Sequence, residues 1–193
     1  ARRQRQMCIR DRSCNTAFVE MSEQLGADEL RKYAKAFGVG ENYDLGVSTS
    51  AGTLGDLPDG AATAQSAIGQ RDVTMTALQA AVMAGTVANK GTRMQPYLVN
   101  RITDAQMKDI RTTKPKKADQ AVNEETAATL TDLMYASERS SAGYDGNGFA
   151  SKTGTAEHGE GLAPHVWYVA FDPERDIAVG VVVKNGGNLG ESA

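Results

Sequence analysis

The sequence is poor in cysteine, in histidine and in long apolar runs. Its 193 residues include two cysteines and two histidines, too few for a disulfide framework and poorly suited to a structural zinc site. The longest uncharged apolar runs are far shorter than the ~20 residues that a membrane helix needs, and the first residues show no signal-peptide pattern. With 40% hydrophobic and 23% charged residues, the composition indicates one globular domain. We expect no metal and no cofactor.

Charge is unevenly distributed along the chain. The first twelve residues carry five arginines and one aspartate, although the whole chain has a formal net charge of −3. Such a basic segment could bind nucleic acid or anionic lipid, but residues 2–11 match the in-frame translation of a transposase adapter used in sequencing libraries. We therefore predict that residues 1–12 are an adapter artefact and not native. Because that segment contributes +4, the other residues carry −7, which argues against binding to nucleic acid.

Apolar residues at helical spacing predict helices at residues 17–25, 28–37, 74–89 and 123–138. Gly26 separates the first two helices. Thr76 with Gln79 forms a capping-box pattern at the start of the third helix, and Asn123 caps the fourth. The inward-facing side chains of the fourth helix are predicted to be Leu130, Leu133 and Met134.

Strands dominate the C-terminal part of the chain. The stretch at 151–157 and the apolar runs at 166–171 and 177–183 are predicted to be adjacent strands of an antiparallel sheet, with a tight hairpin turn at 172–175. A further strand is predicted at 97–102. Residues 40–69 are predicted to form a long irregular segment that lines a cleft, and residues 108–119 a charged surface connection. No element follows to close the sheet, and we expect the native protein to continue beyond both ends.

Two polar clusters could carry chemistry. Lys152-Thr153-Gly154-Thr155 opens a predicted strand and combines an ammonium group, two hydroxyls and a backbone position without a side chain. This combination suits a site that holds a carboxylate and an acyl group. The second cluster, Ser13-Cys14-Asn15, begins a predicted helix. Both clusters also have structural interpretations, because Ser and Asn cap helices and a lysine on an edge strand discourages aggregation.

Taken in order, the clusters resemble two motifs of the penicillin-binding protein transpeptidase domain, within the penicillin-recognising serine enzymes. That family uses S-x-x-K, then S-x-N, then K-T/S-G. Ser13-Cys14-Asn15 matches the second motif and Lys152-Thr153-Gly154 the third, and the resemblance covers residues 13–193. The flanking segments that look like class B, monofunctional enzymes are 15–18, 67–70, 73–80 and 152–157. The resemblance implies an α/β (α+β) fold of the β-lactamase/transpeptidase type, an antiparallel sheet flanked by helices, incomplete here.

The family resemblance implies a peptidoglycan D,D-transpeptidase that cross-links stem peptides through a serine acyl-enzyme. By resemblance, Ser13 relays a proton, Asn15 orients the substrate, and Lys152 keeps a positive field over the site. The residues that would bind substrate are Thr153, Gly154 and Thr155. The backbone N–H of Thr155 would be one oxyanion-hole donor, and a side chain in place of Gly154 would block the substrate.

The first motif of the family is absent. No serine in the 193 residues is followed three residues later by a lysine. In the family that serine is the acylated nucleophile. The chain as given is therefore expected to be inactive, whereas the parent protein is expected to be an active enzyme.

Three other functions remain open on the same fold: a D,D-carboxypeptidase, a serine β-lactamase and a non-catalytic β-lactam sensor. A membrane anchor with a preceding non-catalytic domain would favour the transpeptidase. A cleavable signal with a deacylating Glu would favour the β-lactamase, and a fused transmembrane signalling segment the sensor. The resemblance implies peptidoglycan stem peptides, β-lactam antibiotics and the division or elongation machinery as partners. It implies a location on the extracytoplasmic face of the cytoplasmic membrane, with an N-terminal anchor.

Overall fold

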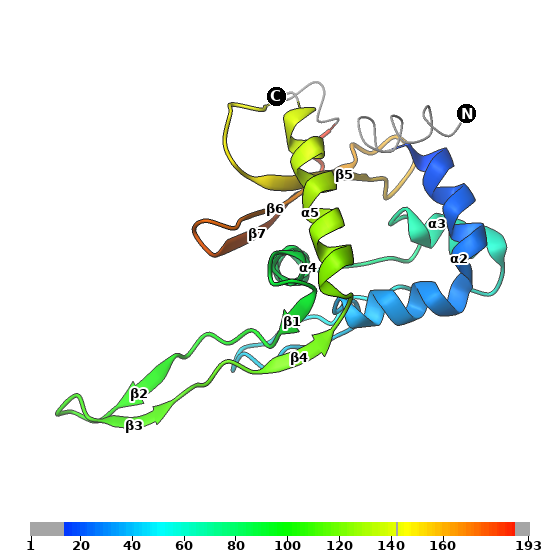
Figure 1. Ribbon diagram of the computed structural model, residues 1–193. Helices are drawn as coiled ribbons and strands as arrows, with labels where there is room; N and C mark the ends of the chain where they lie inside the picture. The colour runs from blue at the N-terminus through cyan, green and yellow to red at the C-terminus, as the bar shows by residue number, and fades with distance from the viewer. Residues whose placement is uncertain (1–13, 142, 188–193) are drawn as a thin grey trace.

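The computed structural model describes residues 14–141 and 143–187, so the predictions for residues 1–12 and for Ser13 lie outside the described residues. The helices are α2 (Asn15–Ala36), α3 (Gly60–Ala67), α4 (Ala77–Ala88) and α5 (Glu124–Arg139). The strands are β1 (Thr92–Met94), β2 (Arg101–Thr103), β3 (Asp109–Thr112), β4 (Lys117–Gln120), β5 (Ala150–Ala156), β6 (His165–Asp172) and β7 (Ile177–Val183). Figure 1 shows helices beside an antiparallel sheet, which confirms the predicted fold class. Within the described ranges, no helix has the length and apolarity that crossing a bilayer requires.

The three predicted C-terminal strands form one antiparallel sheet in the order β5-β6-β7. Their register pairs Lys152 with Val169 and Tyr168 with Val181. The predicted hairpin turn joins β6 and β7, where the Asp172 carboxylate accepts a hydrogen bond from the backbone N–H of Glu174. Because β5 is the last strand of this order, one of its edges has no strand partner among the described residues.

One face of the sheet packs against α4, and α5 packs along β5. The buried cluster between them consists of Ala84, Val87, Ala150 and Phe171. At Gly180, an added Cβ would stand 2.4 Å from the carbonyl oxygen of Ala77 and 2.6 Å from the backbone nitrogen of Ala81. A glycine on β7 and small residues on α4 therefore let the helix backbone lie directly on the strand.

Local signals located the longer helices correctly. The capping box of Thr76 and Gln79 is present at the start of α4, and the Asn123 side chain accepts a hydrogen bond from the backbone N–H of Thr126, 2.8 Å away. Gly26, with φ 79° and ψ 163°, divides α2 into two segments that point in different directions. The prediction for Leu133 is wrong, since this side chain is 46% exposed. It precedes Met134 by one position, which turns it about 100° away around the helix axis.

Three further predictions are wrong in part. Residues 40–69 are not irregular throughout, because α3 lies within them and is capped by the Asp59 side chain. The strand predicted at 97–102 is β2 at Arg101–Thr103 instead. Residues 108–119 are exposed, as predicted for a surface connection, but they include β3 and most of β4. We call residues 101–112 the arm; Figure 1 shows that this hairpin extends away from the rest of the molecule.

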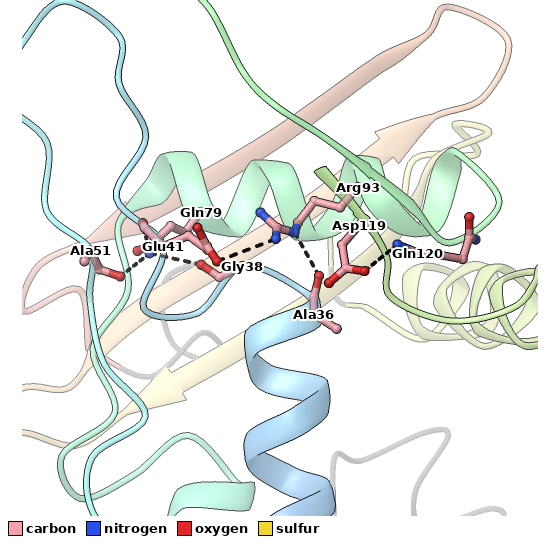
Figure 2. Close-up of polar contacts among 8 residues, drawn as sticks. All are labelled: Ala36, Gly38, Glu41, Ala51, Gln79, Arg93, Asp119 and Gln120. Atoms are coloured by element: carbon pink, nitrogen blue, oxygen red, sulfur yellow. Dashed lines mark hydrogen bonds and ion pairs between the residues drawn. The ribbon is translucent and has the colours of Figure 1, made fainter. Parts of the chain in front are cut away.

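A buried polar junction fixes the base from which the arm extends. Figure 2 shows Arg93 of β1, whose Nε donates to the carbonyl oxygen of Ala36 at the end of α2, 2.8 Å away. Gln79 of α4 is 1% exposed, and its amide nitrogen donates to the carbonyl oxygens of Gly38, Glu41 and Ala51. The end of α2, the start of α4 and β1 are thereby held together.

Candidate active site

The predicted Lys152-Thr153-Gly154-Thr155 cluster lies on β5, at the edge of the sheet that no other described strand covers. Alternation along the strand places Lys152 and Gly154 on one face and Thr153 and Thr155 on the other. Lys152 shares its face with the core residue Ala150, which is fully buried. The ammonium group is therefore held near the border between the core and the sheet edge.

Burial lowers the pKa of Lys152 below its ordinary value of 10.5, because desolvation disfavours the charged form. The Nζ atom donates a hydrogen bond to the carbonyl oxygen of Thr153, 2.7 Å away. A partly desolvated ammonium group exerts a stronger field on nearby groups than one in bulk water. The geometry thus fits the predicted role of Lys152 as a source of positive potential.

The free edge of β5 presents backbone groups as well as side chains. The Gln70 amide nitrogen donates to the carbonyl oxygen of Thr155, 3.2 Å away, so this carbonyl points away from β6. In an antiparallel strand the N–H and C=O groups of one residue point to the same side. The backbone N–H of Thr155, which the family resemblance implies as an oxyanion-hole donor, therefore also faces the open edge.

A pocket of about 200 Å³ adjoins this edge. Its walls come from β5, from Trp167 of β6 and from the segment after α3, and the lining residues are Ile68, Gly69, Val73, Met75, Gly154, Thr155, Ala156 and Trp167. At Gly154, an added Cβ would meet only the Cβ of Trp167, at the ordinary contact distance of 3.4 Å. Packing within the fold therefore does not require a glycine at this position. We attribute the glycine instead to the pocket, whose open surface a side chain would occupy.

Only part of the predicted Ser13-Cys14-Asn15 cluster lies within the described residues. Ser13 lies outside them, and Asn15 is the first residue of α2, with an exposed side chain. The first residue of α2 is preceded by Cys14, which makes no side-chain cap. One series of contacts leads from α2 to the cluster on β5: α2 packs against α3, and Gln70, just after α3, reaches Thr155.

The sequence interpretation missed one polar cluster next to the motif. The side chains of Ser151 and Tyr168 both donate hydrogen bonds to Oε2 of Glu138, the latter over 3.0 Å. Burial is the main cause that raises the pKa of Tyr168. A signal was present, because Glu138 follows Leu130 and Met134 at intervals of four residues, which places a carboxyl group on the apolar stripe of α5.

Elsewhere, no group of three His, Cys, Asp or Glu side chains in the described ranges could hold a metal ion.

Comparison with known proteins gives a family match over nearly the whole chain. The family model of the penicillin binding protein transpeptidase domain matches residues 9–193. The peptidoglycan D,D-transpeptidase PbpA of Mycolicibacterium smegmatis is 44% identical over 186 residues, which cover 92% of this chain and 38% of the relative. PbpA of Mycobacterium tuberculosis is 41% identical over 184 residues, covering 91% and 38%. The chain thus spans 38% of the length of both relatives.

Solved structures give the same match in three dimensions. The crystal structure of PbpA from M. tuberculosis superposes with a TM-score of 0.88 at 40% identity, over 96% of this chain and 44% of that chain. Penicillin-binding protein A of M. tuberculosis in a penicillin G acyl-enzyme complex superposes with a TM-score of 0.87 at 41% identity, over 94% and 42%. The fold described above is therefore that of these domains.

Proposed function

Because the chain belongs to the penicillin-binding protein transpeptidase domain family, we propose that it is part of a peptidoglycan D,D-transpeptidase. The observation that carries the proposal is the uncovered edge of β5. There an outward-facing backbone N–H and a glycine without a structural need for glycine line one pocket, and a partly buried ammonium group lies on the same strand. Two relatives that match this chain at 41–44% identity are D,D-transpeptidases.

In the proposed reaction a serine hydroxyl attacks the D-alanyl-D-alanine bond of a stem peptide and expels D-alanine. An amine of a second stem peptide then attacks the acyl-enzyme and releases the serine. Lys152 stabilises the developing negative charge and tunes Ser13, which passes a proton to the leaving amine. The N–H of Thr155 binds the oxyanion, the hydroxyls of Thr153 and Thr155 bind the substrate carboxylate, and Asn15 orients the peptide.

The nucleophile of this reaction is not among the 193 residues, since none of their serines has a lysine three positions later. We propose that the S-x-x-K segment belongs to the whole protein and precedes Ser13, and that residues 1–12 are not native. The whole protein would lie on the extracytoplasmic face of the cytoplasmic membrane, where peptidoglycan is assembled. Its partners would be stem peptides, β-lactam antibiotics and the division or elongation machinery.

A D,D-carboxypeptidase or β-lactamase would use the same strand edge and would differ in how water reaches the acyl-enzyme. A sensor domain would also be acylated, without turnover. The names of the matching relatives favour the transpeptidase. Release of D-alanine that depends on an acceptor amine would separate the transpeptidase from the three alternatives.

The first prediction concerns labelling with penicillin. The whole protein should form a covalent adduct with fluorescent penicillin, and the 193-residue chain should not, because it lacks the nucleophile. Lys152→Ala in the whole protein should abolish labelling while the circular-dichroism spectrum and melting temperature stay close to those of the wild type. Labelling of the 193-residue chain at any serine would contradict the proposed position of the nucleophile. Undiminished labelling of Lys152→Ala would contradict the role of the lysine.

A further inference from the structure

Glu138 is a buried acidic residue that the proposed reaction does not use. It is 6% exposed, and it lies in the last turn of α5, which ends at Arg139. Both features oppose a carboxylate there, because burial removes its hydration and the C-terminal end of a helix carries partial negative charge. No lysine or arginine of the described ranges forms an ion pair with it. A residue in so unfavourable a place requires compensating contacts.

The compensation comes from two hydroxyl groups on neighbouring strands. Oε2 of Glu138 accepts hydrogen bonds from the hydroxyl of Ser151 on β5 and from that of Tyr168 on β6. Ser151 is 1% exposed, so this contact is shielded from water. Hydrogen bonds from hydroxyls to a carboxylate are short and roughly twice as strong as neutral ones. One carboxyl group thus connects the end of α5 to both strands.

The position of the contact on β5 gives it functional significance. Ser151 immediately precedes Lys152, and Tyr168 is paired with Thr153 in the register of the sheet. The carboxyl group therefore contacts β5 at the residue before Lys152 and contacts β6 at the residue that pairs with Thr153, the one after it. Alternation along β5 turns Ser151 toward Glu138 while Lys152 points to the opposite face, so fixing one side chain also fixes the direction of the other.

We propose that Glu138 is a positioning residue of the transpeptidase site, which holds Lys152 in place through Ser151 and Tyr168. This inference rests on the proposed function. Glu138 does not touch the substrate; it acts by fixing β5 on the side opposite the ammonium group. The alternative is a purely structural role, in which the cluster stabilises the fold and has no effect on the rate of acylation once the protein is folded.

The test separates these roles by measuring acylation of the whole protein by penicillin. Stopped-flow kinetics give the dissociation constant of the non-covalent complex and the rate constant of acylation, and the labelled fraction at saturation gives the proportion of competent molecules. We expect Glu138→Ala to lower the rate constant roughly tenfold, because misplacement of a catalytic group reduces the rate steeply. The dissociation constant should change by less than about threefold, and the competent fraction should remain that of the wild type.

Glu138→Gln tests rescue by a side chain of the same shape. The amide oxygen can still accept one of the two hydroxyls, so this variant should be acylated faster than Glu138→Ala and more slowly than the wild type. Ser151→Ala should lower the rate constant as well. In the double variant Glu138→Ala with Ser151→Ala, the two effects should not add, because both remove the same contact. Glu138→Gln and the single variant Ser151→Ala decide the matter even if Glu138→Ala fails to fold.

Two controls complete the experiment. Glu125→Gln makes the same charge change in the exposed first turn of α5 and should leave the rate constant unchanged. Thr86→Ala removes a 1% exposed side chain of α4 and should lower the melting temperature without slowing acylation. The inference is overturned if the Glu138 and Ser151 variants have a smaller competent fraction than the wild type but their competent molecules are acylated at the wild-type rate. A wild-type whole protein that is not acylated at all overturns the proposed function, and this inference with it.

Discussion

At the scale of single residues, the candidate site depends on how little water surrounds Lys152. The ammonium group shares a strand face with Ala150, which is fully buried, and burial lowers its pKa. A lysine in this environment loses its proton more readily than a lysine in solution, because desolvation disfavours the charged form. The burial that strengthens the electrostatic field of Lys152 therefore also narrows the pH range in which this lysine is charged.

The pH dependence of acylation should reveal this limit. If the cationic form of Lys152 is required, the second-order rate constant of acylation should fall on the alkaline side, at a pH below 10.5. Measurement of penicillin acylation of the whole protein from neutral to alkaline pH tests this. A rate constant that stays flat up to that pH would contradict a role for the charged lysine.

The stability of the protein should change in the opposite direction. Because the folded-state pKa is depressed, the unfolded chain binds more protons between the folded-state pKa and 10.5, so the free energy of unfolding rises with pH in that window. Relative to Lys152→Ala, the wild type should become more stable there while its acylation slows. A parallel loss of stability and rate would instead indicate alkaline unfolding.

At the scale of elements, sequence signals succeeded where they were local and strong. The capping box of Thr76 and the cap of Asn123 start α4 and α5, and continuous apolar runs form β6 and β7. The signals failed for α3, an eight-residue helix of small residues, and for β1 with β4. The latter pair joins Thr92 to Gln120, and such non-local pairing is not visible in a short window.

The candidate site also has a part that the sequence indicates and a part that it does not. Its motif on β5 was recognisable from residue types and order, because the chemistry needs an ammonium group, hydroxyls and a glycine in sequence. The contacts of Gln70 with Thr155 and of Glu138 with Ser151 join distant segments. They depend on where the segment after α3 and the end of α5 lie relative to β5. The sequence holds a signal for only one of them, the position of Glu138 on an apolar helix stripe, and the sequence interpretation did not use it.

The interface between α4 and β7 provides a matched pair of glycine substitutions. Gly180→Ala would place a Cβ 2.4 Å from a backbone oxygen of α4, so it should destabilise the protein by about 1–3 kcal/mol or more. Gly85→Ala, in α4 itself, would place a Cβ 3.5 Å from that of Ala178, an ordinary contact, and should be neutral or stabilise by up to about 1 kcal/mol. Urea unfolding of the whole protein measures both. Equal effects of the two substitutions would contradict the close contact of α4 with β7.

At the scale of the whole molecule, the arm differs from everything around it. Its strands β2 and β3 pack mainly against each other, and Figure 1 shows them extending away from the sheet that carries the candidate site. Large apolar side chains are exposed along it, with Met107 at 68% and Ile110 at 67%. A two-stranded hairpin without other contacts is only marginally stable in water. The arm should therefore contribute little to the stability of the domain or to its chemistry.

Removal of the arm tests this independence. The backbone N–H of Thr113 donates to the carbonyl oxygen of Asn100, 2.7 Å away. Replacing residues 101–112 by Asn-Gly would let this existing hydrogen bond close a two-residue hairpin turn. Because distant sites without shared contacts act independently, we expect penicillin acylation of the whole protein to stay within about twofold of the wild type. The urea midpoint should change little for the same reason. A tenfold or greater loss of acylation at unchanged stability would instead mean that the arm acts on the β5 site, despite lying away from it.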